Sequence, residues 1–262
     1  SKPGLTGSGR IGDSRLARRI SDKIAGEVKF DPFTRGRYST DASHYQVEPI
    51  GVVVPKSTAD IISTIHIACE EGIAVLPRGG GTSQCGQTVC EAIVLDCTKY
   101  LNRILDFDSD RRRIAVEPGL VLDDLNSYLK PFGLWFPVDV STSSRATIGG
   151  MAGNNSCGAR SIVYGTMRDN VHAINAVLTD GSTMTFGEVS DNVSLSHLSD
   201  LQSDLVSRLL DLGRKHDATI VSGFPDLMRR VGGYNIVALL PGGPPRGSWM
   251  EPTMAKPIIH PN

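Results

Sequence analysis

One stretch decides the fold of this 262-residue chain: Pro77-Arg78-Gly79-Gly80-Gly81-Thr82-Ser83. It completes the apolar run IAVLP (73–77), which predicts a buried strand. Three consecutive glycines after a strand let backbone N–H groups converge on an anion, and the two hydroxyl side chains add donors. The stretch therefore predicts a pyrophosphate cradle. A flexible turn between strands is the alternative.

Two familiar phosphate motifs do not fit this loop. Residues 81–88 have the Walker A spacing, but Gln87 stands where that motif requires lysine. A neutral amide cannot offset the charge of β- and γ-phosphates, so nucleotide hydrolysis is not expected. The Rossmann pattern G-x-G-x-x-G also fails, because its third glycine falls on Gln84. The loop indicates a different dinucleotide architecture.

The first half of the chain predicts a small α/β lobe. The apolar runs 51–55 and 92–96 predict two further buried strands around the loop. Ser57 resembles the start of a capping box and opens a helix that extends to about Glu71. An amphipathic helix is expected over 13–24. Strand, helix, strand, loop and strand in this order indicate mostly parallel strands.

The second half predicts an α+β lobe with a mainly antiparallel sheet. A strand is expected over 113–119 and a helix over 121–133. Asp180-Gly181 is a strong hairpin signal between the partly alternating segments on either side of it. A further helix is expected over 199–213. The predicted organisation is a flexible tail at 1–12, lobes at 13–104 and 105–240, and an irregular proline-rich tail at 241–262.

A second loop, at 137–158, is rich in small and hydroxylated residues. Gly149-Gly150 would let a ligand press against the backbone. Asn154-Asn155 need hydrogen-bond partners in this mostly apolar setting, and a polar heterocycle could supply them. A tight packing motif at the start of a helix explains the same residues equally well.

Taken together and in this order, the motifs resemble a known family. PRGGGTS (77–83) followed by TIGG (147–150) and YGT (164–166) is similar to the FAD-binding fold of the vanillyl-alcohol oxidase/p-cresol methylhydroxylase (PCMH) superfamily. More narrowly, the chain resembles the D-lactate, glycolate and D-2-hydroxyglutarate dehydrogenase group over residues 13–240. The resemblance implies an α+β, PCMH-type fold. Further matching segments are YSTDAS (38–43), VVVPKS (52–57), VEPG (116–119) and GGYN (232–235).

The resemblance also implies which residues bind FAD. The pyrophosphate is expected at Gly79, Gly80, Gly81, Thr82 and Ser83, with Arg78, Gly86 and Gln87 beside them. The ribityl chain and flavin edge are expected along Pro137, Asp139, Ser143, Thr147, Ile148, Gly149, Gly150, Asn155 and Gly158. The adenine side is expected to be closed by Tyr164, Gly165 and Val171. Relatives with covalent flavin have histidine where Thr82 stands, so FAD is expected to be non-covalent.

The function implied is an FAD-dependent oxidoreductase that dehydrogenates a 2-hydroxy acid and passes electrons to a separate acceptor. No catalytic residue is assigned, because the cap domain that holds the family's substrate arginine and histidines is not recognised here. His44, next to YSTDAS, is the least dismissible of six histidines that otherwise suit structural or surface roles. A truncated FAD-binding module without turnover and a flavin reductase of the cell-wall-precursor type remain alternatives.

The composition argues against several other classes of protein. The formal net charge of −1 and the lack of pooled basic residues argue against nucleic acid, and Arg111-Arg112-Arg113 reads as a solvated strand edge. No apolar stretch is long enough to span a bilayer. A cytoplasmic protein is expected, with contact to a membrane through its electron acceptor as an alternative. Five cysteines without a C-x-x-C pair predict buried free thiols and no metal site.

Overall fold

A computed structural model describes residues 10–187, 200–224, 234–240 and 260–261. The chain divides into two compact units. The first comprises Ser1–Val171, Asn175–Thr183 and Pro257–Asn262, and the second comprises His172–Ile174 and Met184–Lys256. Each unit is described by itself.

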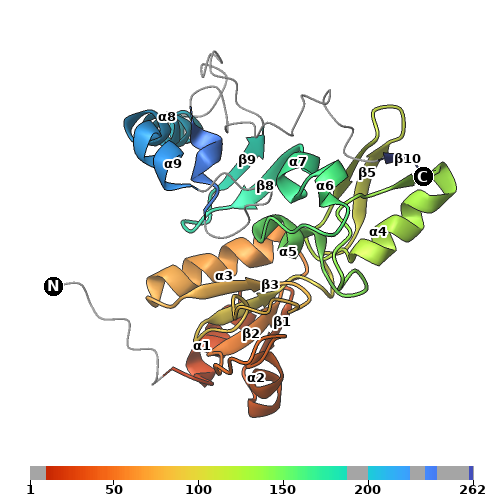
Figure 1. Cartoon of the computed structure of the whole chain (residues 1–262). Coiled ribbons are helices and arrows are strands. Elements are labelled where there is room, and N and C mark those ends of the chain that lie inside the picture. Colours follow the sequence, from red (N-terminus) through yellow and green to blue (C-terminus); the bar gives the residue numbers. More distant parts are fainter. Residues whose placement is uncertain (1–9, 188–199, 225–233, 241–259, 262) are drawn as a thin grey trace. The chain divides into compact units, whose positions relative to one another are not determined.

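A four-stranded sheet carries the glycine loop in the first unit (Figure 1). Its order is β1 (Glu27–Lys29), β2 (Gly51–Val54), β4 (Ile93–Asp96) and β3 (Val75–Arg78). β2 and β3 both pair with β4 in parallel, whereas β1 pairs with β2 antiparallel. Every residue of β2 and β4 is buried, because a sheet of this kind is covered on both faces. The predicted mostly parallel lobe is confirmed.

Helices α3 (Thr58–Glu70) and α1 (Ser14–Ser21) contact each other beside this sheet (Figure 1). The Ser57 side chain accepts from the Asp60 N–H, and the Asp13 side chain caps α1 in the same way. Both helices thus begin where the sequence predicted, and α1 ends at Ser21, three residues before the predicted end. The first hydrophobic core lies between these helices and the sheet and consists of Leu16, Ile20, Phe30, Ile50, Val53, Ile67, Ala68, Ile93 and Leu95.

One helix of this region was not predicted from the sequence. Helix α2 (Pro32–Tyr38) starts after Asp31, whose side chain accepts from the Thr34 N–H, and it has a proline at its first position. Asp-Pro is a helix-start signal as well as a turn signal. Gly36 inside the segment and the lack of an apolar period conceal the helix in the sequence.

A second hydrophobic core is built from later residues of the first unit. Strands β5 (Ile104–Asp108) and β6 (Arg113–Val116) form an antiparallel hairpin, and α4 (Leu122–Leu129) follows it. The 3-10 turn η1 (Lys130–Phe132) and the short strand β7 (Leu134–Trp135) come next. The core consists of Leu120, Leu122, Leu125, Leu129, Leu134, Phe136, Val138, Ala146, Met151 and Met167.

The antiparallel pairing predicted for this half occurs in separate two-stranded sheets. β5 pairs with β6, β7 pairs with β10 (His260–Pro261), and β8 (Ala173–Val177) pairs with β9 (Thr183–Gly187). Arg111 and Arg112 lie in the turn of the β5–β6 hairpin, where Arg112 has a φ of 52°, and Arg113 is the first residue of β6. The arginine run therefore occupies an exposed hairpin end and not the length of a strand edge.

The hairpin signal at Asp180-Gly181 is confirmed. Gly181 has a φ of 83°, and the Leu178 N–H donates to the Ser182 carbonyl across the turn at 2.8 Å. The turn also contacts α3: His66 Nε2 lies 3.0 Å from the Asp180 carbonyl oxygen. This contact assigns His66 a structural role.

The second unit is mainly helical where the structure describes it. It contains α8 (Asp200–Lys215), α9 (Asp217–Gly223) and the 3-10 turn η3 (Ile236–Leu239). Its small core is formed by Ile220, Val237 and Leu240. The helix predicted over 199–213 is confirmed as α8. The first two residues of the GGYN segment and most of the predicted tails lie outside the described residues.

The cysteines correct one expectation. All five are free, but none is buried: Cys69, Cys85 and Cys90 are exposed, and the other two are partly exposed. They lie at the ends of elements or in loops, which composition alone did not indicate. Burial against the Asp96 carboxylate raises the pKa of the Cys97 thiol to about 11, so that thiol stays protonated at neutral pH.

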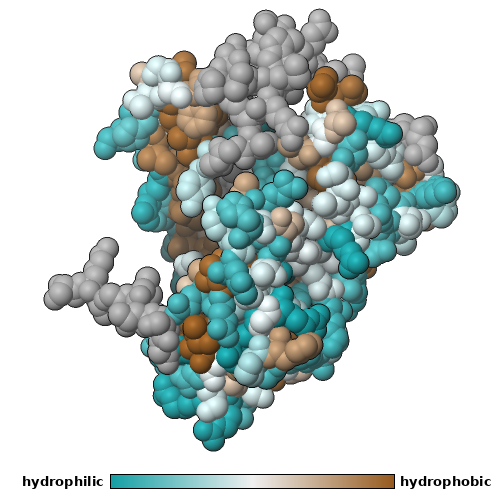
Figure 2. Space-filling model, turned by 60° about the horizontal axis from the view of Figure 1, so that its bottom comes forward, coloured by the Kyte–Doolittle hydropathy of each residue, from teal (hydrophilic) through white to brown (hydrophobic). Residues whose placement is uncertain are grey.

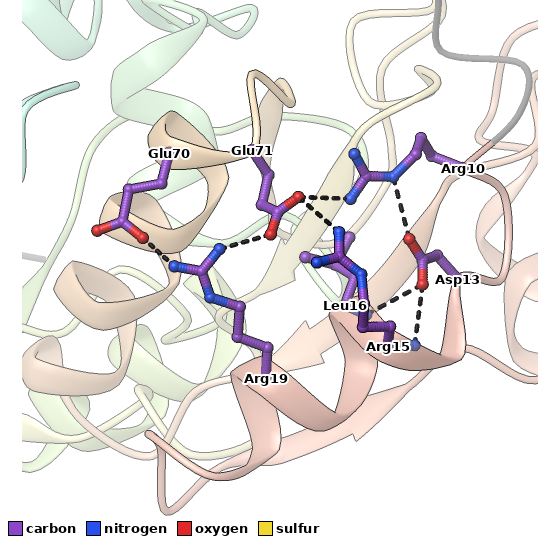
Figure 3. Close-up of polar contacts among 7 residues, drawn as sticks. All are labelled: Arg10, Asp13, Arg15, Leu16, Arg19, Glu70 and Glu71. Atoms are coloured by element: carbon purple, nitrogen blue, oxygen red, sulfur yellow. Dashed lines mark hydrogen bonds and ion pairs between the residues drawn. The ribbon is translucent and has the colours of Figure 1, made fainter.

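One carboxylate ties α1 to the end of α3 (Figure 3). Glu71, which follows α3, accepts hydrogen bonds from Arg10, Arg15 and Arg19, and its side chain is only 10% exposed. A carboxylate beside a helix C-terminus is unfavourable on its own because the helix dipole is negative there. Hydrogen bonds from the three guanidinium groups make the Glu71 carboxylate favourable at this position.

We predict that Glu71→Gln lowers the free energy of unfolding by about 1–2 kcal/mol, because charge-assisted hydrogen bonds are lost. Urea unfolding monitored by circular dichroism measures it. The matched control is Glu70→Gln: that side chain is 61% exposed and pairs only with Arg19 among the described residues. Its effect should stay below about 0.5 kcal/mol. Equal losses of stability in the two variants would contradict the conclusion that Glu71 holds α1 to the end of α3.

The same contact makes stability depend on pH. Hydrogen bonds from Arg10 and Arg19 hold the pKa of Glu71 below its ordinary value of 4.5. A lowered folded pKa contributes stability above the unfolded pKa and loses it as pH falls through the folded pKa. The difference in stability between the wild type and Glu71→Gln should therefore be constant near neutral pH and shrink as pH falls below 4.5.

Candidate cofactor site

The glycine loop after β3 is in direct contact with the second loop. A Cβ atom at Gly79 would lie 2.2 Å from Thr147 Oγ1, and one at Gly80 would lie 2.1 Å from the Arg145 carbonyl oxygen. Real Cβ atoms do not come this close to other atoms, so neither position admits a side chain unless the loops separate. The contact joins two sequence motifs that are far apart along the chain.

This contact gives a reason for two of the glycines. At Gly79 and Gly80 the second loop fills the space that a side chain would need. The backbone N–H groups of residues 79–84 form no hydrogen bond to another described residue. Buried or half-buried N–H groups normally find an acceptor. The loop therefore offers donors that fit an anionic group such as a pyrophosphate.

Other residues of the loop support this geometry. Gly81 has a φ of 65° and Gly86 a φ of 74°, so both adopt a left-handed conformation that favours glycine. The Ser83 hydroxyl accepts from the Cys85 N–H at 3.3 Å. Thr82 is half-buried and Gln87 is exposed.

Arg78 has a different role from the one expected. Its guanidinium donates to the carbonyl oxygens of Tyr38, Thr40 and Thr88 at 3.1, 2.7 and 3.0 Å, and it lies over the Tyr38 ring. Burial lowers the pKa of Arg78. No carboxylate forms an ion pair with it in the described chain. The residue acts as an internal brace that fixes the base of the glycine loop.

The YSTDAS segment lies behind the loop, a role that sequence reasoning missed although it noted the motif. The Ala42 N–H donates to the Gly81 carbonyl at 3.1 Å. Asp41 accepts from the Ser43 N–H and the Thr88 hydroxyl, both at 2.8 Å. Burial alone would raise the pKa of Asp41, but these hydrogen bonds outweigh it and lower the pKa. The loop is thus held on both sides by the segment.

A second buried carboxylate completes this support. The Tyr38 hydroxyl donates to Asp96 at the end of β4, and Asp96 also accepts from the Thr98 N–H and hydroxyl. Burial, and then the hydrogen bond to Asp96, raises the pKa of Tyr38. Tyr38 therefore stays a neutral donor, and its ring remains available for the Arg78 guanidinium.

The TIGG motif starts a short helix, α5 (Ile148–Gly153), with Thr147 as its cap. The Gly149 N–H donates to the Pro118 carbonyl at 2.8 Å, and a Cβ at Gly149 would lie 2.5 Å from Pro118 Cβ. Gly149 therefore packs closely against Pro118, as the packing alternative for this loop predicted. Gly150 is exposed and meets only Thr147 Oγ1, at 3.1 Å, so it remains open to a ligand.

The rest of the second loop is held together by its own polar groups. Asn155 adopts a φ of 43°, and its Oδ1 accepts from the Thr166 hydroxyl and the Arg168 N–H at 3.0 and 2.9 Å. A Cβ at Gly158 would lie 2.2 Å from Asp139 Oδ1. The side-chain oxygen of Asn155 thus finds partners within the protein, as the packing alternative for this loop requires.

The YGT segment ends in a buried, unpaired acceptor. Asn170, the last residue of α7 (Met167–Asn170), is 1% exposed, and its Nδ2 donates to the carbonyls of Tyr164 and Thr166. Its Oδ1 has no hydrogen-bond partner in the described chain. Buried acceptors of this kind usually receive a donor. A ligand group or water beside Val171 could supply one.

The remaining predicted site residues have local roles. The Ser143 carbonyl accepts from the Asp123 N–H at 3.2 Å, Pro137 is buried, and the Ile148 N–H donates to the Leu120 carbonyl at 2.8 Å. Gly165 has a φ of 80°. The Tyr164 ring meets Trp135 edge-on with centroids 5.4 Å apart.

His44, the histidine singled out in the sequence, contacts a neighbouring ring. His44 is exposed and its ring lies 4.3 Å from that of Tyr45. Among the described residues, no group of three or more His, Cys, Asp or Glu side chains is placed to hold a metal ion. Among the same residues, no helix is long and apolar enough to cross a membrane.

Comparison with known proteins identifies the family of this chain. Residues 49–187 match the model of the FAD binding domain family, and this range includes both loops and the hairpin. The chain belongs to the FAD binding domain family. Its cofactor is FAD, and the loop with unpaired N–H donors fits the pyrophosphate of that cofactor. The fold is the PCMH-type FAD-binding fold.

The chain is similar to several flavoprotein relatives. It is 38% identical over 203 residues to a D-2-hydroxyglutarate dehydrogenase of Pantoea ananatis, covering 76% of this chain and 20% of that protein. It is 34% identical over 177 residues to the glycolate oxidase subunit GlcD of Bacillus subtilis, covering 66% of this chain and 38% of that protein. The chain therefore spans about a fifth of the length of the dehydrogenase relatives that it matches.

Solved structures show the same fold. An alkyldihydroxyacetonephosphate synthase superposes with a TM-score of 0.60 at 18% identity, covering 70% of this chain and 36% of the other. The 6-hydroxy-D-nicotine oxidase of Arthrobacter nicotinovorans superposes with a TM-score of 0.56 at 23% identity, covering 63% and 36%. At these identities the likeness concerns the fold alone.

We predict that Gly80→Ala separates the two loops. A single methyl group against the Arg145 carbonyl should lower the free energy of unfolding by about 1–3 kcal/mol and weaken FAD binding at least about tenfold. Urea unfolding and FAD titration measure the two effects. Gly153→Ala is the matched control, since a Cβ there meets nothing within 4 Å. The loop contact is refuted if Gly80→Ala behaves like this control.

Arg78→Lys should weaken both the fold and FAD binding. A lysine ammonium cannot present a planar fork to three carbonyl oxygens, so we expect a loss of about 1–2 kcal/mol of stability. Thermal unfolding with and without FAD is the measurement. Arg111→Lys, at a side chain that is 77% exposed, is the control and should change neither quantity. A variant that lost FAD affinity without losing stability would indicate that Arg78 contacts the cofactor directly.

Proposed function

We propose that this chain is the FAD-binding domain of an oxidoreductase that dehydrogenates a 2-hydroxy acid of the D-lactate, glycolate or D-2-hydroxyglutarate type. The observation that carries the proposal is the locked pair of loops with unpaired N–H donors in a chain similar to a D-2-hydroxyglutarate dehydrogenase. Bound FAD would supply the hydride-accepting chemistry. Electrons would pass on to a separate acceptor.

The chain's own residues would bind and orient the cofactor. The N–H groups of residues 79–84 and the Thr82 and Ser83 hydroxyls would hold the pyrophosphate. Arg78 would keep the loop in shape from below and, as an unpaired positive charge, would favour an anion above it. Gly150 would let the ligand approach the backbone of α5. The other proposed FAD-site residues are Gly86, Gln87, Pro137, Asp139, Ser143, Thr147, Ile148, Gly149, Asn155, Gly158, Tyr164, Gly165 and Val171.

We also propose that the chain folds as two lobes, at 13–104 and 105–240. Two separate hydrophobic cores support this division: the first is formed by residues between 16 and 95, and the second by residues between 120 and 167. The glycine loop follows a strand of the first core, and the TIGG motif lies in the second. FAD would then bind where residues of both lobes meet within the first compact unit. We further propose a cytoplasmic location, or contact with a membrane through the electron acceptor.

Turnover needs groups beyond those that hold the flavin. Removing hydride from a 2-hydroxy acid requires a base for the hydroxyl proton and cations for the carboxylate. Among the described residues, His44 lies beside Tyr45, His66 contacts the hairpin, and Arg78 is occupied by carbonyl oxygens. These contacts favour the alternative that the chain alone is a binding module without turnover.

The proposal is tested on the purified chain after incubation with excess FAD and removal of free flavin. We expect a flavin absorbance spectrum, and acid precipitation should release all the yellow colour, because Thr82 offers no attachment point for a covalent bond. Dye reduction with D-2-hydroxyglutarate, D-lactate and glycolate should stay far below the usual enzyme range of roughly 1–1,000 per second.

Each other outcome has a distinct meaning. Absence of bound flavin would contradict the proposed function. Colour left on the precipitate would contradict non-covalent binding. Dye reduction at ordinary rates would place the catalytic groups within these residues, with His44 the first to mutate. Flavin reduction by a nicotinamide cofactor would favour the reductase alternative.

A further inference from the structure

A turn at residues 41–45 follows α2 and lies beside the glycine loop. Thr40 and Gln46, on either side of it, pair as an isolated antiparallel bridge. Within it, the Ser43 N–H donates to Asp41 Oδ1 at 2.8 Å, and three of its five residues are exposed. Figure 2 shows a mostly hydrophilic surface where α1 and α2 lie. Hydrogen bonds thus hold the shape of this turn at a hydrophilic surface.

Two hydrogen bonds join the turn to the glycine loop. The Ala42 N–H donates to the Gly81 carbonyl at 3.1 Å. The Thr88 hydroxyl donates to Asp41 Oδ2 at 2.8 Å, and the Thr88 carbonyl accepts from the Arg78 guanidinium at 3.0 Å. Thr88 is therefore fixed through both its side chain and its backbone.

The hydrogen bond to Gly81 fixes the direction of a donor. A peptide group is planar, and in a trans peptide the C=O and N–H bonds point in opposite directions. No peptide bond of the described chain is cis. Because the Gly81 carbonyl points toward Ala42, the Thr82 N–H of the same peptide group points away from it. That N–H has no hydrogen-bond acceptor among the described residues, so it is available to an anion on the side of the loop opposite the turn.

We propose that Asp41 is a positioning residue for the pyrophosphate: it fixes the turn against Thr88, and the turn directs the Thr82 N–H toward the cofactor. This role rests on the proposed pyrophosphate site at residues 79–84. A negative charge beside the loop opposes the binding of an anion, so the charge of Asp41 does not explain its place there. Its hydrogen bonds to the Ser43 N–H and the Thr88 hydroxyl do.

The sign of the effect on FAD binding separates these two properties of Asp41. Asp41→Ala removes the charge and both hydrogen bonds, and titration of flavin-free protein should show an FAD dissociation constant raised about five- to tenfold. Asp41→Asn removes the charge but keeps a hydrogen-bonding group toward each partner, so its constant should equal the wild-type value or fall below it. Tighter binding by both variants, or equal weakening in both, would overturn the proposal.

Asp180→Ala is the matched control. Asp180 Oδ1 accepts from the Ser182 N–H and hydroxyl at 2.9 and 2.6 Å in a turn that contacts α3, so the variant removes the same kinds of hydrogen bond. It should leave the FAD dissociation constant within about twofold of the wild-type value. A loss of affinity as large as that of Asp41→Ala would show that the effect is not specific to the turn at 41–45, and would overturn the proposal.

Thr88 supplies a second pair of variants, which decides the question even if Asp41→Ala does not fold. Thr88→Val replaces the hydroxyl by a methyl group of similar size and should raise the FAD dissociation constant about fivefold. Thr88→Ser keeps the hydroxyl and should bind FAD within about twofold of the wild type. Equal affinities of the valine and serine variants would overturn the proposal.

The double variant Asp41→Ala/Thr88→Val tests whether the two residues act together. It should bind FAD no more weakly than Asp41→Ala, because both substitutions remove the same hydrogen bond. Losses that add in full would overturn the proposal. Absence of FAD binding by the wild type would instead contradict the proposed function, and with it this role of Asp41.

Discussion

The contact between the glycine loop and the second loop (137–158) is the constraint on which the rest of the cofactor site depends. Gly79 meets Thr147 and Gly80 meets the Arg145 carbonyl at distances that leave no room for a methyl group. This contact holds the loop in a shape in which its N–H groups have no acceptor among the described residues. Donors left without a protein partner are available to an anion, and this availability is the basis of the proposed pyrophosphate site.

The charged groups around the loop support it more than they contact a ligand. The Arg78 guanidinium donates its hydrogen bonds to backbone carbonyls. It also lies over the ring of Tyr38, whose hydroxyl donates to Asp96 at the end of β4. Asp41 fixes the other side through Thr88. A preformed loop binds with less ordering cost than a flexible one. The glycine loop thus rests on hydrogen bonds to two carboxylates and on one half-buried cation.

Much of this could be predicted from the sequence. The glycine loop after a buried strand, the Ser57 cap and the Asp180-Gly181 turn are local signals, because neighbouring residues determine them. The ordered motifs then indicated the PCMH-type fold and FAD, and the family match confirmed both. The inward direction of Arg78 was not predictable, because its three acceptors come from segments that only tertiary folding brings to it. The contact between Gly80 and the Arg145 carbonyl could not be predicted for the same reason. Helix α2 was not predicted because Asp31-Pro32 is also a common turn signal.

The most direct measurement compares FAD with FMN in calorimetric titrations of flavin-free protein. FMN carries the same isoalloxazine ring but has neither the pyrophosphate nor the adenosine. If the locked loops form a pyrophosphate cradle, FAD binds at least about a hundredfold more tightly than FMN. Equal affinities would show that the glycine loop makes no contact with the cofactor, and would contradict the account.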